Sequence, residues 1–115
     1  MKIHPKYTLN KSKKNIFVDI DETICFYSGN RAYELAEPNY KYIDKINKLY
    51  DEGNNITYWT ARGSLSNIDY YDLTKKQLDD WKCKYHKIIT GMSEKYPKPN
   101  YDMIIDDRSK RIEEI

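Results

Sequence analysis

The sequence predicts an α/β domain with a mainly parallel β-sheet. Strand-like segments alternate with amphipathic helical segments, in the order strand, helix, strand, helix, strand, strand. In three of the four strands, acidic or hydroxyl side chains come directly after the last apolar residue. Parallel strands bring their carboxyl ends to one edge, where ligands bind, so we expect these side chains to meet there.

Length and composition indicate a single soluble domain in a reducing compartment, the cytoplasm. The chain has 115 residues, of which 39% are hydrophobic and 33% are charged. Its net charge of +2 makes no case for nucleic-acid or membrane binding, and no apolar run approaches the roughly 18 residues of a membrane span. The cysteines at 25 and 83 are too far apart in sequence for a metal motif and are expected to be free thiols. We expect residues 1–14 to be a loosely ordered basic segment and residues 15–115 to form the domain.

The first half of the chain supplies two predicted strands and one helix. Ile16–Ile20 is an apolar strand, and Cys25–Glu37 is expected to form a loop or short hairpin beyond its end. Pro38 suits the first turn of a helix, which Gly53-Asn54 ends. Ile56–Thr60 is the second strand. The apolar face of the helix is expected to comprise Tyr42, Ile43, Ile46, Leu49 and Tyr50.

The second half begins with a turn at residues 61–64 and a second helix, capped by Ser66 or Asn67. His86–Thr90 is the third strand. The prolines of Gly91–Tyr101 favour a loop, which at 11 residues is about long enough for a parallel crossover. Met103–Ile105 is a short fourth strand. The inward stripe of the second helix is expected to comprise Tyr71, Thr74, Leu78, Trp81 and Tyr85.

Clustered acids at the predicted sheet edge indicate a metal site. Asp19 and Asp21 follow the first strand, and Asp106 and Asp107 follow the fourth. Four neighbouring carboxylates repel one another and raise each other's pKa unless a cation balances them. Carboxylates are hard oxygen ligands, and no His/Cys cluster competes with them, so Mg²⁺ is the expected ion.

Other residues would allow such a site to handle a phosphoryl group. Mg²⁺ commonly bridges carboxylates to a phosphate, and a transferring phosphoryl group needs donors and cations around its oxygens. Thr60 offers a hydroxyl at the end of the second strand. Lys98 or Lys95 offers an ammonium from the loop before the fourth strand, and Lys98 has the better spacing to Asp106.

Together these residues resemble the four motifs of the haloacid dehalogenase (HAD) superfamily. Asp19-Ile20-Asp21-Glu22-Thr23 is similar to the first motif, Asp-x-Asp-x-Thr, and Thr60, Lys98 and Ile105-Asp106-Asp107 are similar to the second, third and fourth, in the family's order. The resemblance covers roughly residues 15–110. It is strongest to small bacterial and phage proteins related to capsule-biosynthesis phosphatases, and it implies a three-layer, Rossmann-like fold.

The resemblance implies a role for each matching position. Asp19 is the expected nucleophile, forming an aspartyl-phosphate, and also a Mg²⁺ ligand. Asp21 is the expected general acid/base, with its backbone carbonyl on the metal. Asp106 is expected to bind Mg²⁺ directly, and Asp107 to bind or orient a metal-bound water. The phosphoryl group is expected to contact Thr60, Ala61, Arg62 and Lys98, although a surface ion pair is an equal alternative for Arg62.

The intervals between the motifs leave no room for the cap domain that this family often inserts. An uncapped site admits water, which favours hydrolysis of a phosphomonoester. The expected substrate is a small phosphorylated metabolite, and the resemblance alone suggests a sugar phosphate. Tyr27, Arg31 and Tyr33 are candidate substrate contacts, with solvated loop residues as the alternative. Alternatively, a neighbouring subunit of a homo-oligomer would enclose the site and contact the substrate.

Three other functions fit parts of the pattern. A nucleotide or polynucleotide phosphatase would use the open site and the basic N-terminal segment. A receiver-type phospho-acceptor domain uses similar residues, but its acidic pair precedes its phospho-accepting aspartate, whereas here the acidic pair comes last. A phosphate-binding module without turnover is disfavoured, because no catalytic position is missing from the sequence.

Overall fold

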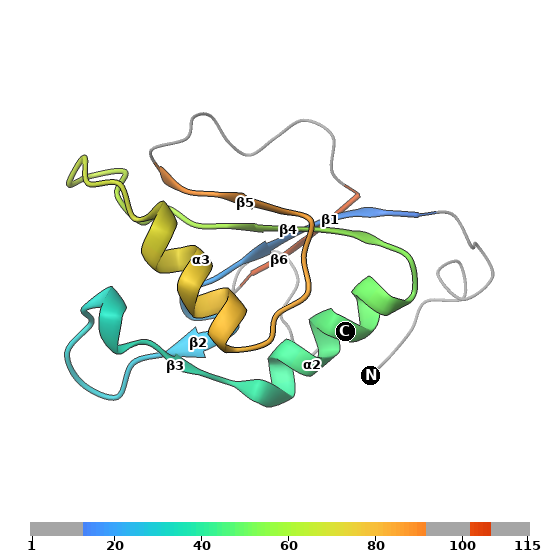
Figure 1. The fold of residues 1–115 in the computed structure, drawn as a ribbon, viewed down its shortest axis with the longest axis horizontal. Helices are drawn as coiled ribbons and strands as arrows, with labels where there is room; N and C mark the ends of the chain where they lie inside the picture. The colour runs from blue at the N-terminus through green and yellow to red at the C-terminus, as the bar shows by residue number, and fades with distance from the viewer. Residues whose placement is uncertain (1–12, 92–101, 107–115) are drawn as a thin grey trace.

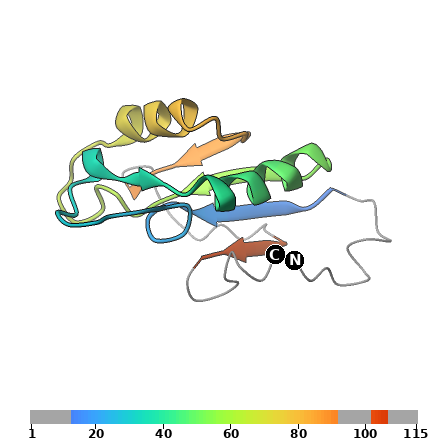
Figure 2. The same cartoon turned by 90° about the horizontal axis from the view of Figure 1, so that it is seen from below.

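The computed structural model describes residues 13–91 and 102–106 of the chain. These residues form a four-stranded parallel sheet with two α-helices, which lie on one face of it (Figures 1 and 2). A separate two-stranded hairpin follows the first strand. In chain order the elements are β1 (Asn15–Asp19), β2 (Cys25–Phe26), a 3₁₀ turn η1 (Tyr33–Leu35), β3 (Glu37–Pro38), α2 (Tyr40–Asp51), β4 (Asn55–Trp59), α3 (Tyr71–Asp80), β5 (Lys87–Ile89) and β6 (Met103–Ile105).

The strand order is β5-β4-β1-β6, and every neighbouring pair is parallel. The steps from β1 to β4 and from β4 to β5 run in the same direction, and right-handed crossovers then place α2 and α3 on the same face. Strand β6 lies on the other side of β1, so the direction reverses at β1. Such a reversal is where open α/β sheets bind ligands. The predicted α/β class with a mainly parallel sheet is confirmed, and the described residues provide the sheet and one helical layer.

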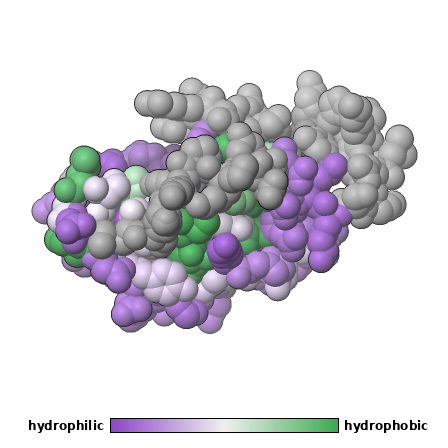
Figure 3. Space-filling view, turned by 90° about the horizontal axis from the view of Figure 1, so that it is seen from above, coloured by the Kyte–Doolittle hydropathy of each residue, from purple (hydrophilic) through white to green (hydrophobic). Residues whose placement is uncertain are grey.

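Strand β1 forms the centre of the core. Its alternating side chains Ile16 and Val18 are buried in one cluster with Ile43 and Ile46 of α2 and Leu78 of α3. Fully burying a side chain of this size is worth about 1.5–3 kcal/mol, so these contacts fix the position of β1. Phe17, between Ile16 and Val18 on β1, packs its ring edge-to-face against the Trp59 ring, with the ring centroids 6.4 Å apart. Figure 3 views the face opposite the helices, where apolar side chains are again visible.

The structure confirms the first predicted helix but corrects its start. Ile43 and Ile46 are buried, and the other three residues of the predicted apolar face pack against the core cluster. Pro38, however, is not in the first helical turn, because it pairs with Cys25 in the β2–β3 hairpin. The helix is capped instead by Asn39, whose side chain accepts a hydrogen bond from the Tyr42 backbone N–H at 3.1 Å.

The predicted caps of the second helix are wrong. Helix α3 begins at Tyr71, several residues after Ser66 and Asn67. Asn67 is in the left-handed region, with a φ of 61°, and donates its backbone N–H to Gly63, so it belongs to the preceding turn. Thr74 and Leu78 of the predicted stripe are buried, whereas Tyr71 is 38% exposed.

The other sequence predictions agree with the structure to within about one residue. The first two predicted strands each begin and end one residue earlier than predicted, β5 lacks both predicted terminal residues, and β6 has the predicted bounds. The Cys25–Glu37 segment contains the hairpin that was one of its two predicted forms. Most of the predicted 91–101 loop lies outside the described residues, as do residues 1–12 of the predicted basic segment and residues 107–115.

Candidate active site

Two predicted acids meet at the carboxyl edge of the sheet. Asp19 is the last residue of β1, and Asp106 is the first residue after β6. Val18 pairs with Ile105, so Asp19 and Asp106 each follow one member of the same cross-strand pair. Neighbouring strands lie about 4.8 Å apart, which places the two acids at adjacent strand ends. One oxygen of Asp19 accepts the Ile20 backbone N–H at 2.9 Å.

The chain then makes a tight turn that carries Asp21 to the same edge. The backbone N–H groups of Thr23 and Ile24 both donate to the Ile20 carbonyl, at 3.1 and 3.0 Å. Glu22 has a φ of 67°, a left-handed conformation that costs a residue with a Cβ about 1–2 kcal/mol. The turn thus depends on its hydrogen bonds, which include one from Glu22 N–H to the Cys25 carbonyl at 2.9 Å.

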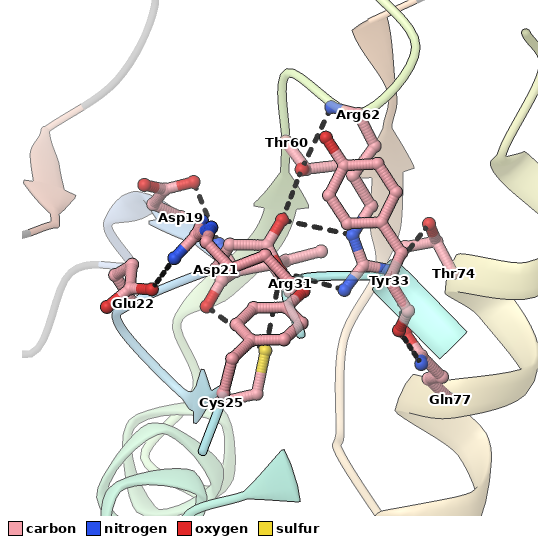
Figure 4. A network of polar contacts seen from close by, with 12 residues as sticks. Asp19, Asp21, Glu22, Cys25, Arg31, Tyr33, Thr60, Arg62, Thr74 and Gln77 are labelled. Atoms are coloured by element: carbon pink, nitrogen blue, oxygen red, sulfur yellow. Dashed lines mark hydrogen bonds and ion pairs between the residues drawn. The ribbon is translucent and has the colours of Figure 1, made fainter. Parts of the chain in front are cut away.

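Asp21 forms a two-point ion pair with Arg62, which follows β4 (Figure 4). The Arg62 Nη2 lies 2.9 Å from Asp21 Oδ1, and Nε lies 3.0 Å from Oδ2. The Arg62 side chain is fully buried, and that of Asp21 is 16% exposed. The predicted alternative that Arg62 forms a surface ion pair is therefore wrong, because the pair is inside the protein.

Helix α3 and the hairpin hold the remaining faces of the Arg62 guanidinium. Its Nη1 donates to Thr74 Oγ1 at 3.2 Å and to Gln77 Oε1 at 2.6 Å. The Tyr33 ring lies over it, with its centroid 4.8 Å from Cζ, and the Gln77 amide donates to the Tyr33 carbonyl at 2.7 Å. Since every nitrogen of the guanidinium has a protein acceptor, its geometry suits the positioning of Asp21. Direct contact between Arg62 and a phosphoryl group stays a prediction.

These contacts determine the ionisation of Asp21. Burial raises its pKa, but the hydrogen bonds and positive charge of Arg62, with a hydrogen bond from Tyr27, outweigh burial, so the pKa falls below its usual 3.8. The Tyr27 hydroxyl donates to Asp21 Oδ1 at 2.6 Å, and its own pKa is raised by burial and by this carboxylate. At neutral pH Asp21 is therefore a carboxylate and Tyr27 a hydrogen-bond donor.

The Cys25 side chain completes the surroundings of Asp21. It is buried, with Sγ 3.6 Å from Asp21 Oδ1. Burial, with the nearby Asp21 charge, raises the pKa of the thiol. Cys25 therefore stays protonated and acts as a weak donor to the carboxylate.

Thr60 lies between Asp21 and the turn that carries Arg62. Its buried Oγ1 is 3.4 Å from Asp21 Oδ2 and accepts the Arg62 backbone N–H at 3.2 Å. Its backbone N–H donates to the Ile89 carbonyl at 3.0 Å, which extends the β4–β5 pairing by one residue. Ala61 is exposed, and its carbonyl accepts a hydrogen bond from Ser64 N–H at 2.9 Å. Four predicted residues, Asp19, Asp21, Thr60 and Asp106, are thus brought to one sheet edge.

A glycine fixes the turn that carries Thr60 and Arg62. A Cβ atom at Gly91 would lie 2.7 Å from Ser64 N, and 2.8 Å from the carbonyl oxygens of Ala61 and Arg62. All three atoms are backbone, so we expect Gly91→Ala to shift the turn and lower the free energy of unfolding by about 1–3 kcal/mol. Urea unfolding monitored by circular dichroism measures this loss. Gly29→Ala is the control, since a Cβ there meets nothing within 4 Å, and equal losses in the two variants would contradict the prediction.

The described donor set fits a Mg²⁺ site that is completed by substrate and water. Asp19 and Asp106 provide two carboxylates at adjacent strand ends, whereas both oxygens of Asp21 are engaged by Arg62. Residues 13–91 and 102–106 contain no group of three or more His, Cys, Asp or Glu side chains that could hold a metal ion. Mg²⁺ is usually held by one or two carboxylates together with phosphate and water, so two acids suffice. Because both side-chain oxygens of Asp21 already accept hydrogen bonds from Arg62, the predicted metal contact of Asp21 is left to its backbone carbonyl.

Several predicted site residues lie outside the described part of the chain. They are Lys95, Lys98 and Asp107. Their roles as phosphate-binding lysine and as second acid of the fourth motif stay predictions.

Sequence reasoning missed the role of Gln77 in supporting Arg62. Gln77 and Thr74 are polar, yet they lie on the buried side of α3 next to Leu78. Buried polar side chains nearly always have partners. A polar pair three residues apart on an otherwise apolar helix face is the signal that could have indicated a buried charged group.

Comparison with known proteins supports the fold and leaves function open. No family model matches the sequence, and no curated protein matches it. No helix in the described part of the chain has the length and apolar composition needed to cross a membrane. The fold is similar to the crystal structure of a structural-genomics target from Vibrio cholerae, with a TM-score of 0.66 and 24% sequence identity over 88% of this chain and 85% of that chain. At this level of identity the similarity shows the shared α/β fold alone.

Proposed function

We propose that this protein is a Mg²⁺-dependent phosphomonoester hydrolase of the HAD type. One observation carries the proposal: Asp19 and Asp21, Thr60, and Asp106 come from three separate parts of the chain and converge on the edge where the sheet reverses direction. Isolated acids at strand ends are common, but this combination provides a nucleophile, a proton carrier, a hydrogen-bond donor to the phosphoryl group and a metal ligand. The order of these residues in the sequence matches the HAD motifs.

The proposed reaction has two displacements at phosphorus. Asp21 first takes up a proton from solvent when the substrate binds. In the first displacement, a carboxylate oxygen of Asp19 attacks the phosphorus atom, the bond to the substrate alcohol breaks, and Asp21 gives its proton to the departing oxygen. In the second, Asp21 takes a proton from water, the water oxygen attacks phosphorus, and the bond to Asp19 breaks. The products are the alcohol and inorganic phosphate, and Asp21 returns its proton to solvent, so both aspartates end as carboxylates.

The Arg62 pair sets a condition on this mechanism. A lowered pKa suits Asp21 as the base of the second step but opposes its protonation for the first. A bound phosphoryl dianion brings negative charge next to Asp21 and raises its pKa. The Thr60 hydroxyl donates a hydrogen bond to Asp21 in the structure. In the proposed mechanism it transfers this hydrogen bond to the phosphoryl group of the substrate. Arg62 then holds Asp21 in position throughout, which is a positioning role.

The carboxylates of Asp19 and Asp106 would hold Mg²⁺, with Asp107 as a further candidate. When bound, the ion neutralises charge on the phosphoryl oxygens. Lys98 is the proposed phosphate-binding lysine. We also propose that the site has no cap domain: between Thr23 and Thr60 the chain forms only the hairpin, η1, α2 and β4. The proposed substrate is a small phosphorylated metabolite, and a second subunit of a homo-oligomer would supply any further walls.

Phosphate release from a panel of phosphomonoesters tests the proposal. The panel comprises p-nitrophenyl phosphate, sugar phosphates, nucleotides and a 3′-phosphorylated oligonucleotide, assayed with Mg²⁺ and with EDTA. We expect hydrolysis with Mg²⁺, and at least about a hundredfold loss in EDTA, because the ion supplies several kcal/mol of charge stabilisation. Bis(p-nitrophenyl) phosphate, a diester, is the negative control. Hydrolysis that persists in EDTA, or the absence of hydrolysis on every substrate, would overturn the proposal.

A further inference from the structure

An exposed arginine lies beside the proposed site, on the loop between β2 and β3. The Arg31 side chain is 60% exposed, and its Cζ lies 4.8 Å from the centroid of the Tyr27 ring. The hydroxyl of that ring donates to Asp21. The Tyr27 ring therefore lies between the Arg31 guanidinium and Asp21, the proposed proton carrier. Figure 4 shows Arg31 beside Glu22 and Asp21.

Hydrogen bonds hold this loop in a defined position. The side chain of Asn30 accepts the Ala32 backbone N–H at 3.0 Å, and the Ser28 hydroxyl donates to the Glu37 carboxylate at 3.1 Å. The pairing of β2 with β3 closes the base of the loop. Arg31 is thus presented from an ordered hairpin next to the sheet edge.

The two arginines of the described residues differ in what they can bind. Arg62 is buried and all its nitrogens have protein acceptors. Arg31 forms an ion pair with Glu22, whose side chain is 41% exposed. Exposed pairs of this kind contribute little to stability, with a median of about 0–1 kcal/mol, so an anionic ligand can replace Glu22 at little cost.

The proposed mechanism places the substrate alcohol near Arg31. The departing oxygen must come within hydrogen-bonding reach of Asp21, and Tyr27 occupies the Oδ1 side of that carboxylate. An alcohol part that extends from that oxygen along Tyr27 reaches the guanidinium that lies over its ring. A guanidinium binds carboxylates and phosphates through two parallel hydrogen bonds, which an ammonium cannot do.

We infer that Arg31 determines specificity by binding a second anionic group, a carboxylate or a phosphate, on the alcohol part of the substrate. This inference rests on the proposed function. It narrows the substrate class to phosphomonoesters that carry another negative charge. Glu22 then acts as the internal partner of Arg31 that the substrate anion displaces.

Equilibrium binding of non-hydrolysable ligands tests the inference separately from turnover. Isothermal titration calorimetry with Mg²⁺ compares alkylphosphonates with ω-carboxyalkylphosphonates and alkane bisphosphonates of the same chain lengths. For at least one length, we expect wild type to bind the two-anion ligand about ten- to a hundredfold more tightly, the range expected for hydrogen bonds between charged groups. Arg31→Ala should abolish this preference and Arg31→Lys should keep part of it. The two series show whether a carboxylate or a phosphate is preferred.

Matched variants separate this effect from a general loss of charge. Lys75 on α3 has a similar environment, with its ammonium 5.9 Å from the Tyr85 ring and 3.0 Å from the Asp79 carboxylate. Lys75→Ala should keep the wild-type preference, and Glu22→Gln should increase it several-fold by removing the competing carboxylate. Equal affinity for both ligand types in wild type, an unchanged preference in Arg31→Ala, or no phosphonate binding at all would overturn the inference. Mg²⁺-dependent phosphate release together with an unchanged preference would overturn it while leaving the proposed function in place.

Discussion

Replacing Arg62 with alanine should lower the free energy of unfolding by about 3–5 kcal/mol, the usual cost of removing one partner from a buried ion pair. The variant leaves the Asp21 carboxylate mostly buried without its counter-charge, and it leaves Thr74 and Gln77 without the donor that they share. A domain of this size is stable by only about 5–15 kcal/mol, so the loss is a large fraction of the total. Urea unfolding at pH 7, monitored by circular dichroism, measures it.

A double variant provides the control for this prediction. Asp21→Asn combined with Arg62→Met removes both charges and keeps the approximate side-chain volumes, and should cost less than Arg62→Ala alone. Comparing the single variants Asp21→Asn and Arg62→Met with the double variant gives the coupling between the residues. If Arg62→Ala lowers the free energy of unfolding by less than about 1 kcal/mol, the buried ion pair is contradicted, because an exposed ion pair contributes that little.

The same ion pair predicts how stability depends on pH. The pKa of Asp21 is lower in the folded protein than its ordinary value of 3.8. Its stabilisation is therefore fully present above that value and is lost as pH falls from about 4 through the lowered folded-state pKa. We expect this acid-induced loss to be smaller in Asp21→Asn than in wild type. Equal slopes of unfolding free energy against pH in this range would contradict the assignment.

Replacing Asp19 with asparagine should reduce Mg²⁺-dependent phosphate release by at least about a thousandfold, because the amide cannot replace the carboxylate as nucleophile. The fold should persist, since an asparagine side-chain oxygen can still accept the Ile20 N–H bond that Asp19 accepts. Steady-state kinetics on the best substrate of the panel, with unfolding measured in parallel, tests both parts of the prediction.

Asp44→Asn is the matched control for the Asp19 variant. It makes the same change of charge at an exposed position on α2. We expect its kcat/KM to remain within a few-fold of wild type. If Asp19→Asn folds normally and keeps more than about a tenth of the activity, covalent catalysis by Asp19 is excluded.

The strands and the acids at their ends could be predicted because their signals are local. An apolar run that stops at Asp19 or Asp106 shows both the strand and its polar end within a few residues. The helix starts were less predictable, because competing local structures decide them. Pro38 suits a first helical turn, yet it pairs with Cys25, and Asn67 suits a cap, yet it adopts a left-handed conformation in the preceding turn.

The environment of Arg62 could not be predicted because its partners are distant in sequence. An arginine in a polar turn after a strand usually faces solvent, and nothing adjacent indicates otherwise. Its burial depends on Asp21 from the first turn and on Gln77 from a helix that follows it. These three positions come together only when the sheet and α3 are packed, so the ion pair is a property of the tertiary structure.

Strand β6 pairs with β1 although most of the chain separates them in sequence, so this pair forms late in protein synthesis. The Asn15 backbone N–H donates to the Asp102 carboxylate at 2.6 Å, and the Asp102 N–H donates to the Asn15 carbonyl at 2.7 Å. A nascent chain on the ribosome can form β1, α2 and β4 long before residues 102–106 emerge. It then lacks Asp106 and has an unpaired β1 edge, which is prone to pairing with other chains. Strand β6 therefore brings Asp106 to the proposed catalytic site and covers the β1 edge in the same step.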